Sequence, residues 1–342
     1  MTTRAFITGV SGTELTAAER EFIRDERPWG FILFKRNIET PAQVTALVAE
    51  MRDARGVADA PVLIDQEGGR VQRLGPPHWP VYPPGAVFAK LYNTDSALGL
   101  TAARLSARLI AADLADLGIT VDCLPLADVP VPGADAVIGN RAYGTEPGKV
   151  AAIARAVTDG LEQGGVLPVL KHIPGHGRAT ADTHFKLPSV DTPMDELERT
   201  DFAAFKPLAD LPMAMTAHVV FSAVDPAHPA TTSATMIAQV IRGVIGFQGL
   251  LMSDDVSMNA LAGSLAERTH AIFVAGCDMA LHCNGNIEEM RDVAAQTPEL
   301  SGRALERAKA ALAARKAPQP FDRAAARAEL DALIARANTA SA

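Results

Sequence analysis

The sequence predicts a (β/α)8 barrel, and three observations support this fold class. Short apolar runs alternate with longer amphipathic segments along almost all of the 342 residues. The apolar runs are continuous, which is typical of parallel strands that are buried on both faces. Eight such runs occur, and eight strand–helix units favour a closed barrel over an open sheet. No Gly-x-Gly-x-x-Gly follows an early strand, which argues against a doubly wound dinucleotide-binding fold.

The expected elements follow one another in strand–helix order. We expect strands at 5–10, 30–34, 61–65, 119–124, 166–171, 213–218, 249–254 and 278–282. We expect helices at 41–55, 98–117, 146–163, 234–244 and 262–275. Three segments rich in turn-forming and polar residues should be long connections: 68–97, 128–145 and 172–194. Long loops at the carboxyl ends of barrel strands are where this fold builds active sites.

The end of the chain is expected to be helical. Segments 301–316 and 322–338 are rich in Ala, Arg and Glu, and we expect two helices that pack on the barrel. Because α/β barrels routinely reach this length as one domain, residues 1–342 should form a single catalytic domain with 300–342 as a helical tail.

Composition and charge exclude several classes of protein. With 48% hydrophobic and 21% charged residues, the chain has the composition of an ordinary soluble globular protein. Its formal charge of −8 argues against a nucleic-acid partner. No run approaches the ~20 apolar residues of a membrane span, and no signal-peptide pattern is present. The three cysteines are too few, and odd in number, for a disulfide framework, so a cytoplasmic location fits best.

Polar residues stand where six of the eight expected strands end. They are Asp65, Asp122, Lys171 with His172, His218, Asp254 with Asp255, and His282. One acid at a strand end is often only a helix cap, but this concentration would be costly in a purely structural protein. Since barrel strands all end at the catalytic face, we expect a functional cleft there.

The densest polar cluster is Lys-His-Ile-Pro-Gly-His-Gly-Arg-Ala-Thr-Ala-Asp-Thr-His-Phe-Lys-Leu-Pro, residues 171–188. Asp182 stands two positions before His184. Its carboxylate could hold that imidazole in one tautomer and leave the other ring nitrogen to exchange a proton near neutral pH. The simpler interpretation is a polar surface loop with turn-forming residues.

A metal site is a further interpretation of the same cluster. His172 and His176 are four residues apart, and Asp182 and His184 could complete a ligand set. Pro174, Gly175 and Gly177 interrupt any helix there, however, so the i, i+4 geometry is lost. We therefore expect no metal and no cofactor.

The second cluster is Met-Ser-Asp-Asp-Val-Ser-Met-Asn-Ala, residues 252–260. Adjacent side chains on a strand point to opposite sides, so only one of Asp254 and Asp255 should face the barrel mouth. The other should cap the following helix or bind backbone amides. Periodicity leaves the choice between them open.

At these clusters the sequence resembles the bacterial β-N-acetylhexosaminidases of glycoside hydrolase family 3. The resemblance rests on Lys-His-Ile-Pro-Gly-His-Gly (171–177) followed by Asp-Thr-His-Phe (182–185), Asp-Gln-Glu-Gly-Gly-Arg-Val-Gln-Arg (65–73), Gly-Phe-Ile-Leu-Phe-Lys-Arg-Asn (30–37), Ile-Gly-Asn-Arg-Ala-Tyr (138–143) and Ser-Asp-Asp-Val-Ser-Met (253–258). These motifs follow in the family's order from residue 30 to about 260. Around 121–128, Val-Asp-Cys-Leu-Pro-Leu-Ala-Asp departs from the family form, so Asp122 has no assigned role.

The resemblance implies a role for each matching position. Asp254 would be the nucleophile, and His184, paired with Asp182, would be the general acid/base. The sugar would be bound by Asp65, Arg73, Arg141, Lys171 and His172.

The resemblance also implies an activity. The chain would be a retaining exo-β-N-acetylglucosaminidase of the single-domain type. Its partner would be a small carbohydrate such as an N-acetylglucosaminyl-anhydromuramyl peptide from cell-wall recycling. We expect no nucleic-acid or membrane partner, and a monomer or weak homo-oligomer. A metal-dependent barrel hydrolase and a non-catalytic sugar-binding protein are the alternatives.

Overall fold

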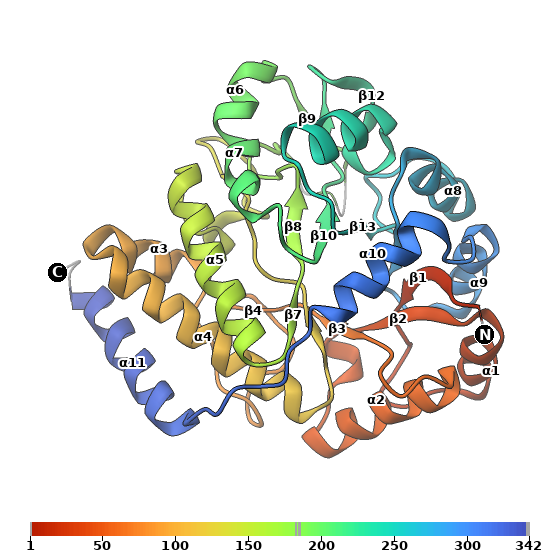
Figure 1. The fold of residues 1–342 in the computed structure, drawn as a ribbon, viewed down its shortest axis with the longest axis horizontal. Helices are drawn as coiled ribbons and strands as arrows, with labels where there is room; N and C mark the ends of the chain where they lie inside the picture. The colour runs from red at the N-terminus through yellow and green to blue at the C-terminus, as the bar shows by residue number, and fades with distance from the viewer. Residues whose placement is uncertain (1, 182, 184–185, 340–342) are drawn as a thin grey trace.

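The computed structural model describes residues 2–181, 183 and 186–339, which form a parallel barrel ringed by helices (Figure 1). The strand order is β7-β6-β3-β2-β1-β14-β13-β10-β8. β7 (Leu167–Pro168) and β8 (Leu170–Ile173) are two parts of one run that is interrupted at Val169. Because β7 pairs with β6 (Val121–Asp122) and β8 pairs with β10 (Met213–Thr216), this run closes the sheet. The predicted (β/α)8 barrel is confirmed.

The remaining strands complete this barrel, and the helices surround it. The other barrel strands are β1 (Arg4–Thr8), β2 (Pro28–Leu33), β3 (Val62–Ile64), β13 (Leu250–Asp255) and β14 (Met279–His282). The helices include α1 (Ala17–Glu26), α2 (Pro41–Arg55), α3 (Gly85–Thr94), α4 (Ser96–Asp116), α5 (Pro147–Gln163), α6 (Met194–Arg199), α7 (Asp201–Phe205), η5 (Met236–Val244), α8 (Leu265–Ala275), α9 (Ile287–Gln296), α10 (Gly302–Ala313) and α11 (Arg323–Thr339). Small sheets join β4 (Gln66–Gly68) to β5 (Val71–Gln72), and β9 (Ser189–Val190), β11 (Val220–Phe221) and β12 (Asp225–Pro229) to one another. In the described part of the chain, no helix is long and apolar enough to cross a membrane.

The structure differs from the expected elements mainly between the strands. The segment 68–97, expected to be an extended connection, contains the helix α3. Its prolines end at Pro84, whose extended backbone precedes the first helical residue, and good helix formers follow. Helices α1 and α9 were also not expected, and η5 is a π-helix.

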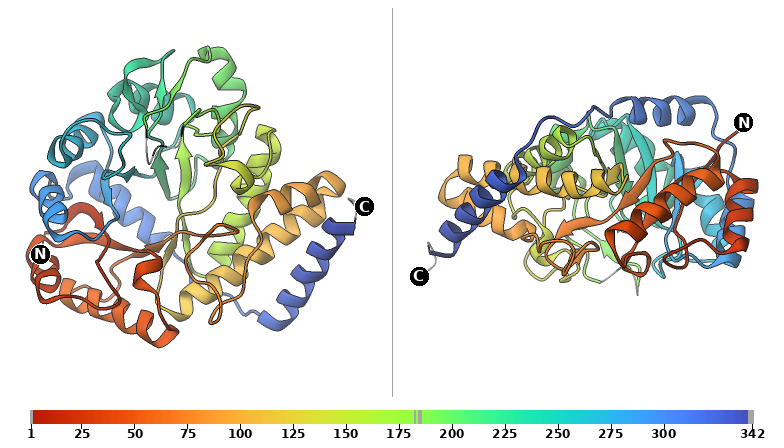
Figure 2. Two further views of the ribbon diagram at one scale, coloured as in Figure 1. Left: turned by 180° about the vertical axis from the view of Figure 1, so that it is seen from behind. Right: turned by 90° about the horizontal axis from the view of Figure 1, so that it is seen from below.

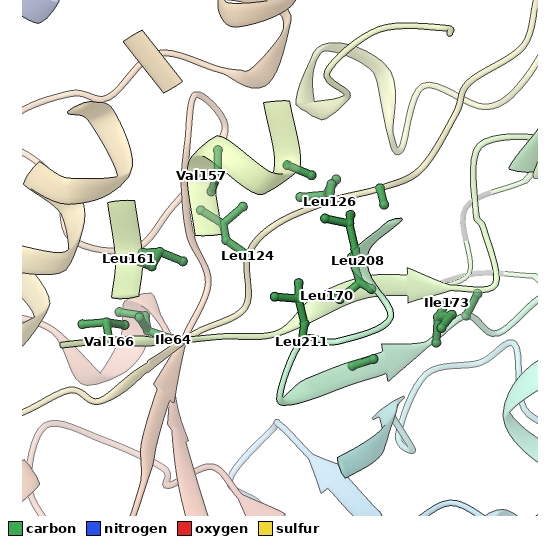
Figure 3. Packing of buried hydrophobic residues seen from close by; sticks show 14 of the residues in the cluster. Ile64, Leu124, Leu126, Val157, Leu161, Val166, Leu170, Ile173, Leu208 and Leu211 are labelled. Carbon is green, nitrogen blue, oxygen red and sulfur yellow. The ribbon is translucent and has the colours of Figure 1, made fainter. Parts of the chain in front are cut away.

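Two hydrophobic clusters divide the barrel into an inside and an outside. Ile7, Leu63 and Met252 belong to the inner cluster, while strand neighbours such as Phe6 belong to the outer one. This is the alternation that a strand buried on both faces produces. Figure 3 shows part of the outer cluster, which includes Val157 and Leu161 of α5 and Leu170 and Ile173 of β8.

Helix α10 covers the end of the barrel where the strands begin. Ala308 and Ala311 of α10 belong to the inner cluster. The amide of Leu300, just before α10, donates to the carbonyl of Thr3, just before β1, at 2.7 Å. In the side view of Figure 2, α10 lies on one face of the molecule, and the loops that follow β3 and β6 lie on the opposite face. Helix α10 therefore closes the end of the barrel where the strands begin, and the carboxyl ends of the strands stay open for a site.

A buried carboxylate fastens α10 to the strands. Asp278 Oδ1 lies 2.9 Å from Arg307 Nη1 of α10. Its Oδ2 lies 2.8 Å from Arg242 Nη2 and accepts the amide of Leu251 at 2.9 Å. One side chain thus joins α10, η5 and β13.

We predict that Asp278→Ala lowers the free energy of unfolding by about 3 kcal/mol, because two largely buried guanidinium groups and one amide lose their acceptor. Urea denaturation followed by circular dichroism measures this change. The matched control is Asp116→Ala, which removes an exposed pair with Arg323 and should cost at most about 1 kcal/mol. Equal losses in the two variants would contradict the assignment.

Candidate active site

A cavity of about 160 Å³ lies at the carboxyl ends of the barrel strands. Its lining includes these predicted site residues: Asp65, Arg73, Arg141, Lys171, His172 and Asp254. Asp182 and His184 lie outside the described residues, whereas Thr183 between them lines the cavity. The structure thus brings the predicted nucleophile and the predicted sugar-binding residues to one place.

A continuous ion-pair network lies at the cavity wall. Lys171 Nζ lies 2.8 Å from Asp65 Oδ1 and 2.7 Å from Glu67 Oε1. Arg73 Nη2 lies 3.0 Å from Asp65 Oδ2. Arg141 donates through Nε and Nη2 to the two oxygens of Glu67, each at 2.8 Å. Because three cations share two carboxylates, the network carries one net positive charge.

The members of this network stay ionised although they are buried. Burial alone would raise the pKa of Asp65, but Lys171 and Arg73 outweigh it and hold that pKa below its usual range. Burial likewise opposes the charge on Lys171, but Asp65 and Glu67 raise the pKa of the ammonium above its usual value. A ligand in the cavity therefore meets charged groups, whose hydrogen bonds are stronger than those of neutral ones.

The β4–β5 hairpin positions the residues of the network that follow β3. The buried Gln66 accepts the amides of Arg73 and Leu74 at 2.9 Å through Oε1, and it donates to the carbonyl of Leu74 through Nε2. Gly68 has a φ of +95°, and a Cβ there would lie 2.4 Å from the carbonyl oxygen of Pro83. This turn therefore requires glycine in order to pack against the segment that follows it.

Asp122, to which the sequence analysis assigned no role, lies next to the ion-pair network. Its Oδ1 accepts the amide of Gln66 at 3.0 Å, and its Oδ2 has no hydrogen-bond partner among the described residues. Burial raises the pKa of Asp122 well above its usual value, and the nearby Asp65 and Glu67 add to that rise. Asp122 therefore supports the hairpin through Oδ1, and burial favours the neutral form of its carboxyl.

The two acids at the end of β13 have different surroundings, although both line the cavity. Asp255 accepts the amide and hydroxyl of Ser257 at 3.0 and 2.6 Å and the amide of Cys283 at 3.2 Å. Its carboxylate therefore holds the local chain. Asp254 accepts the amide of Asp255 at 2.8 Å through Oδ1, which leaves Oδ2 as the oxygen that we assign to the cavity.

Asp254 is held in its ionised form. Burial alone would raise its pKa, but the imidazoles of His218 and His172, the amide of Asp255 and the ammonium of Lys171 outweigh burial and lower it. An ionised carboxylate at a cavity wall can act as a nucleophile or stabilise a positive charge. The geometry therefore distinguishes Asp254 from Asp255, whose carboxylate oxygens both accept hydrogen bonds from the local chain.

His218, which was expected at a strand end, contacts the backbone of this acid pair at Asp255. The ring is fully buried, and burial lowers the pKa of the imidazole, while Asp254 and Asp255 oppose that shift. Nε2 lies 3.0 Å from the carbonyl of Asp255, which only accepts, so Nε2 carries a proton. Nδ1 lies 2.7 Å from the hydroxyl of Thr231, which donates to the carbonyl of Ala217 at 3.0 Å. His218 thus holds the carbonyl of Asp255.

Two functional residues were missed by sequence reasoning. Glu67 lies inside the segment 65–73, and Asp128 ends the segment 121–128. Asp128 is fully buried, and its Oδ2 lies 2.8 Å from Nδ1 of His172. Both carboxylates stand in segments that the sequence analysis singled out, but the side chains that they contact lie on other loops of the chain.

The metal interpretation of the loop finds no ligand cluster in the structure described. Across residues 2–181, 183 and 186–339, no group of three or more His, Cys, Asp and Glu could hold a metal ion. Nδ1 of His172 lies 2.8 Å from Oδ2 of Asp128, and Nε2 of His176 lies 3.4 Å from the hydroxyl of Thr183. The other two suggested ligands, Asp182 and His184, lie outside the described residues.

Comparisons with known proteins agree with this geometry. The family model described as "Glycosyl hydrolase family 3 N terminal domain" matches residues 7–313. A protein named beta-hexosaminidase from Alkalilimnicola ehrlichii is 39% identical over 282 residues, which are 81% of this chain and 79% of the relative.

Solved structures are similar over almost the whole chain. NagZ from Neisseria gonorrhoeae in complex with a zinc ion matches with a TM-score of 0.87 and 30% identity, covering 98% of this chain and 99% of that one. The same protein in complex with N-trifluoroacetyl-D-glucosamine matches with a TM-score of 0.82 and 32% identity, with the same coverage of 98% and 99%. A family 3 β-N-acetylglucosaminidase from Paenibacillus has a TM-score of 0.84 and 29% identity, covering 97% of this chain and 66% of that one.

The family model matches most of the chain, residues 7–313, and this range contains the cavity-lining residues. This chain belongs to glycosyl hydrolase family 3 and is a glycoside hydrolase.

Proposed function

We propose that this chain is a retaining exo-β-N-acetylglucosaminidase that releases terminal β-linked N-acetylglucosamine from peptidoglycan-derived fragments in the cytoplasm. The observation that carries the proposal is the position of Asp254, an ionised acid at the wall of the cavity that also contains the ion-pair network. The names of the relatives support the sugar: beta-hexosaminidase, β-N-acetylglucosaminidase and a NagZ that binds an N-acylated glucosamine. We also propose that residues 1–342 are one domain, because a single hydrophobic cluster contains residues from Phe6 to Leu333.

The ion-pair network is suited to bind the sugar. Arg73 lines the cavity, and its buried Nε has no hydrogen-bond partner among the described residues. Asp65 and Lys171 can accept from and donate to vicinal hydroxyl groups while they remain paired with each other. Binding in a single cavity at the carboxyl ends of the barrel strands would select the terminal sugar of a chain, which is the exo specificity that we propose.

In the proposed first step, Asp254 Oδ2 attacks the anomeric carbon while the bond from that carbon to the leaving oxygen breaks. His184 gives its proton to the leaving oxygen, and Asp182 stabilises the imidazole in the required tautomer. The product is a covalent glycosyl-enzyme together with the free aglycone. The roles of His184 and Asp182 rest on the family resemblance, since both lie outside the described residues.

In the proposed second step, water attacks the anomeric carbon and gives a proton to His184. The bond to Asp254 breaks, and the sugar leaves with retained configuration. Most glycosidases use a second carboxylate for this proton transfer, whereas an imidazole has an ordinary pKa of ~6.5 and needs little adjustment to work near neutral pH.

We predict that the protein hydrolyses an aryl β-N-acetylglucosaminide and that exhaustive chelation leaves the rate unchanged. The measurement compares aryl glycosides of glucose, N-acetylglucosamine and N-acetylgalactosamine, each with and without chelator. Activity that disappears on chelation and returns with zinc would establish the metal-dependent alternative. The absence of turnover on all three would leave the sugar-binding alternative.

We predict that Asp254→Asn abolishes turnover, because an amide neither attacks the anomeric carbon nor stabilises a positive charge there. Incubation with a 5-fluoro N-acetylglucosaminyl fluoride, followed by peptide mass spectrometry, should find the sugar on Asp254. Asp255→Asn is the matched control and should retain labelling at Asp254 with lower stability, because Asp255 holds Ser257 and Cys283. A label on Asp255 would show that the nucleophile is misassigned.

We predict that His184→Ala slows substrates with poor leaving groups by ~10²–10⁴-fold, the usual contribution of general acid–base assistance. An aryl glycoside of a very acidic phenol needs little protonation, so the variant should still form the glycosyl-enzyme from it. Azide should then accelerate turnover and give the β-glycosyl azide, and Asp182→Asn should show a milder form of the defect. Equal losses on both kinds of substrate, without an azide effect, would assign the proton to another group.

A further inference from the structure

We propose that Asp128 is a positioning residue whose two carboxylate oxygens have separate tasks: one anchors the turn 172–176, and the other fixes the tautomer of His172. This inference deepens the proposed function and rests on it for the sugar that His172 meets. None of the sequence motifs assigned a role to Asp128.

The hydrogen bonds of Asp128 divide cleanly between its two oxygens. Oδ1 accepts the backbone amide of His176 at 2.7 Å and that of His172 at 3.3 Å. Oδ2 lies 2.8 Å from the ring nitrogen Nδ1 of His172. The backbone of the turn and the side chain of His172 therefore depend on different atoms of one carboxylate.

The position of Asp128 is fixed by the barrel. The preceding residue, Ala127, donates its amide to the carbonyl of Lys171 at 2.7 Å, which places Asp128 beside His172. On the other side of the turn, a Cβ at Gly177 would lie 2.1 Å from the carbonyl oxygen of Val129. The two segments are thus in contact at both ends of the turn, and Asp128 is fully buried between them.

The contact between Asp128 and His172 indicates which ring nitrogen of His172 carries a proton. Oδ1 of Asp128 accepts two backbone amides, which favours the ionised form of the carboxyl, and an ionised carboxylate only accepts hydrogen bonds. Nδ1 of His172 must then be the donor. Because the ring lines the cavity, Nε2 on its opposite edge is the atom left for the ligand. In the neutral ring, that nitrogen accepts a hydrogen bond from a sugar hydroxyl.

The same carboxylate reaches the loop of the proposed acid/base. The amide of His176 is held by Oδ1 of Asp128, and Nε2 of His176 lies 3.4 Å from the hydroxyl of Thr183. Thr183 stands between Asp182 and His184 in the sequence. Asp128 is therefore the common anchor of a sugar-binding imidazole and of the segment that leads to the acid/base.

Asp128→Asn separates the two tasks. The two amides still require an oxygen at the position of Oδ1, so the new amide nitrogen takes the position of Oδ2 and donates toward Nδ1 of His172. Nδ1 must then accept, and the ring proton moves to Nε2. The backbone anchor is retained, while the hydrogen-bonding character of the cavity-facing nitrogen is reversed. Asp128→Ala removes both contacts and serves as the comparison.

Two measurements test this inference. Ring-nitrogen NMR of His172 in the wild-type protein should show the proton on Nδ1 at neutral pH, and in Asp128→Asn it should show the proton on Nε2. The kcat/KM of Asp128→Asn should fall on the order of 10–100-fold, the usual range for a residue that orients another ligand-binding group. Its resistance to urea should stay close to that of the wild type, whereas Asp128→Ala should be less stable.

A double-mutant cycle with His172→Ala provides the control. If Asp128 acts through His172, then adding Asp128→Asn to His172→Ala should change kcat/KM less than twofold. A full additional loss in that background, or a wild-type His172 that carries its proton on Nε2, would overturn the inference. NMR needs no substrate, and kinetics can use any aryl glycoside that the wild type hydrolyses. An incorrect sugar assignment would therefore leave both readouts intact.

Discussion

Lys171 is almost completely buried at the centre of the site, and an ammonium group in such a place is stable only when carboxylates surround it. Asp65 and Glu67 supply those carboxylates, and each of them needs a second cation because it is buried as well. Arg73 and Arg141 meet that need from two different loops. The pairing of one lysine therefore determines where both loops lie, and with them the shape of the cavity.

Features that depend on local sequence patterns could be predicted from the sequence, whereas features that depend on contacts between loops could not. The strands were predictable because continuous apolar runs mark burial on both faces, and parallel strands bring their ends, such as Asp65 and Asp254, to one edge. Helix α1 has a capping box of Thr16 and Glu19, a signal that was present but not used. Glu67 was not predictable by spacing, because its role depends on contacts with other loops.

The two ends of the barrel have different side chains: apolar groups close one end, and the polar groups of the site occupy the other. At the end where the strands begin, α10 closes the inner cluster with small side chains such as Ala308, and Asp278 fixes the helix to the strands. At the opposite end, polar groups replace the apolar plug, and each is held by its neighbours. Asp122 shows the cost of this arrangement, because burial and the neighbouring acids Asp65 and Glu67 raise its pKa well above the usual value. The closed end thus supplies the stability that the open end lacks.

The number of acids already present explains why histidine suits the proposed proton transfers. Asp254 stays ionised because imidazoles and Lys171 offset its burial, and Asp65 and Glu67 lie in the same network as that lysine. A further carboxylate beside Asp254 would compete for the same cations and raise the pKa of both acids. An imidazole held by its own aspartate avoids this competition, since the pair adds no net charge when the ring is protonated. The described pair of Asp128 and His172 shows that this chain builds such a unit within the site.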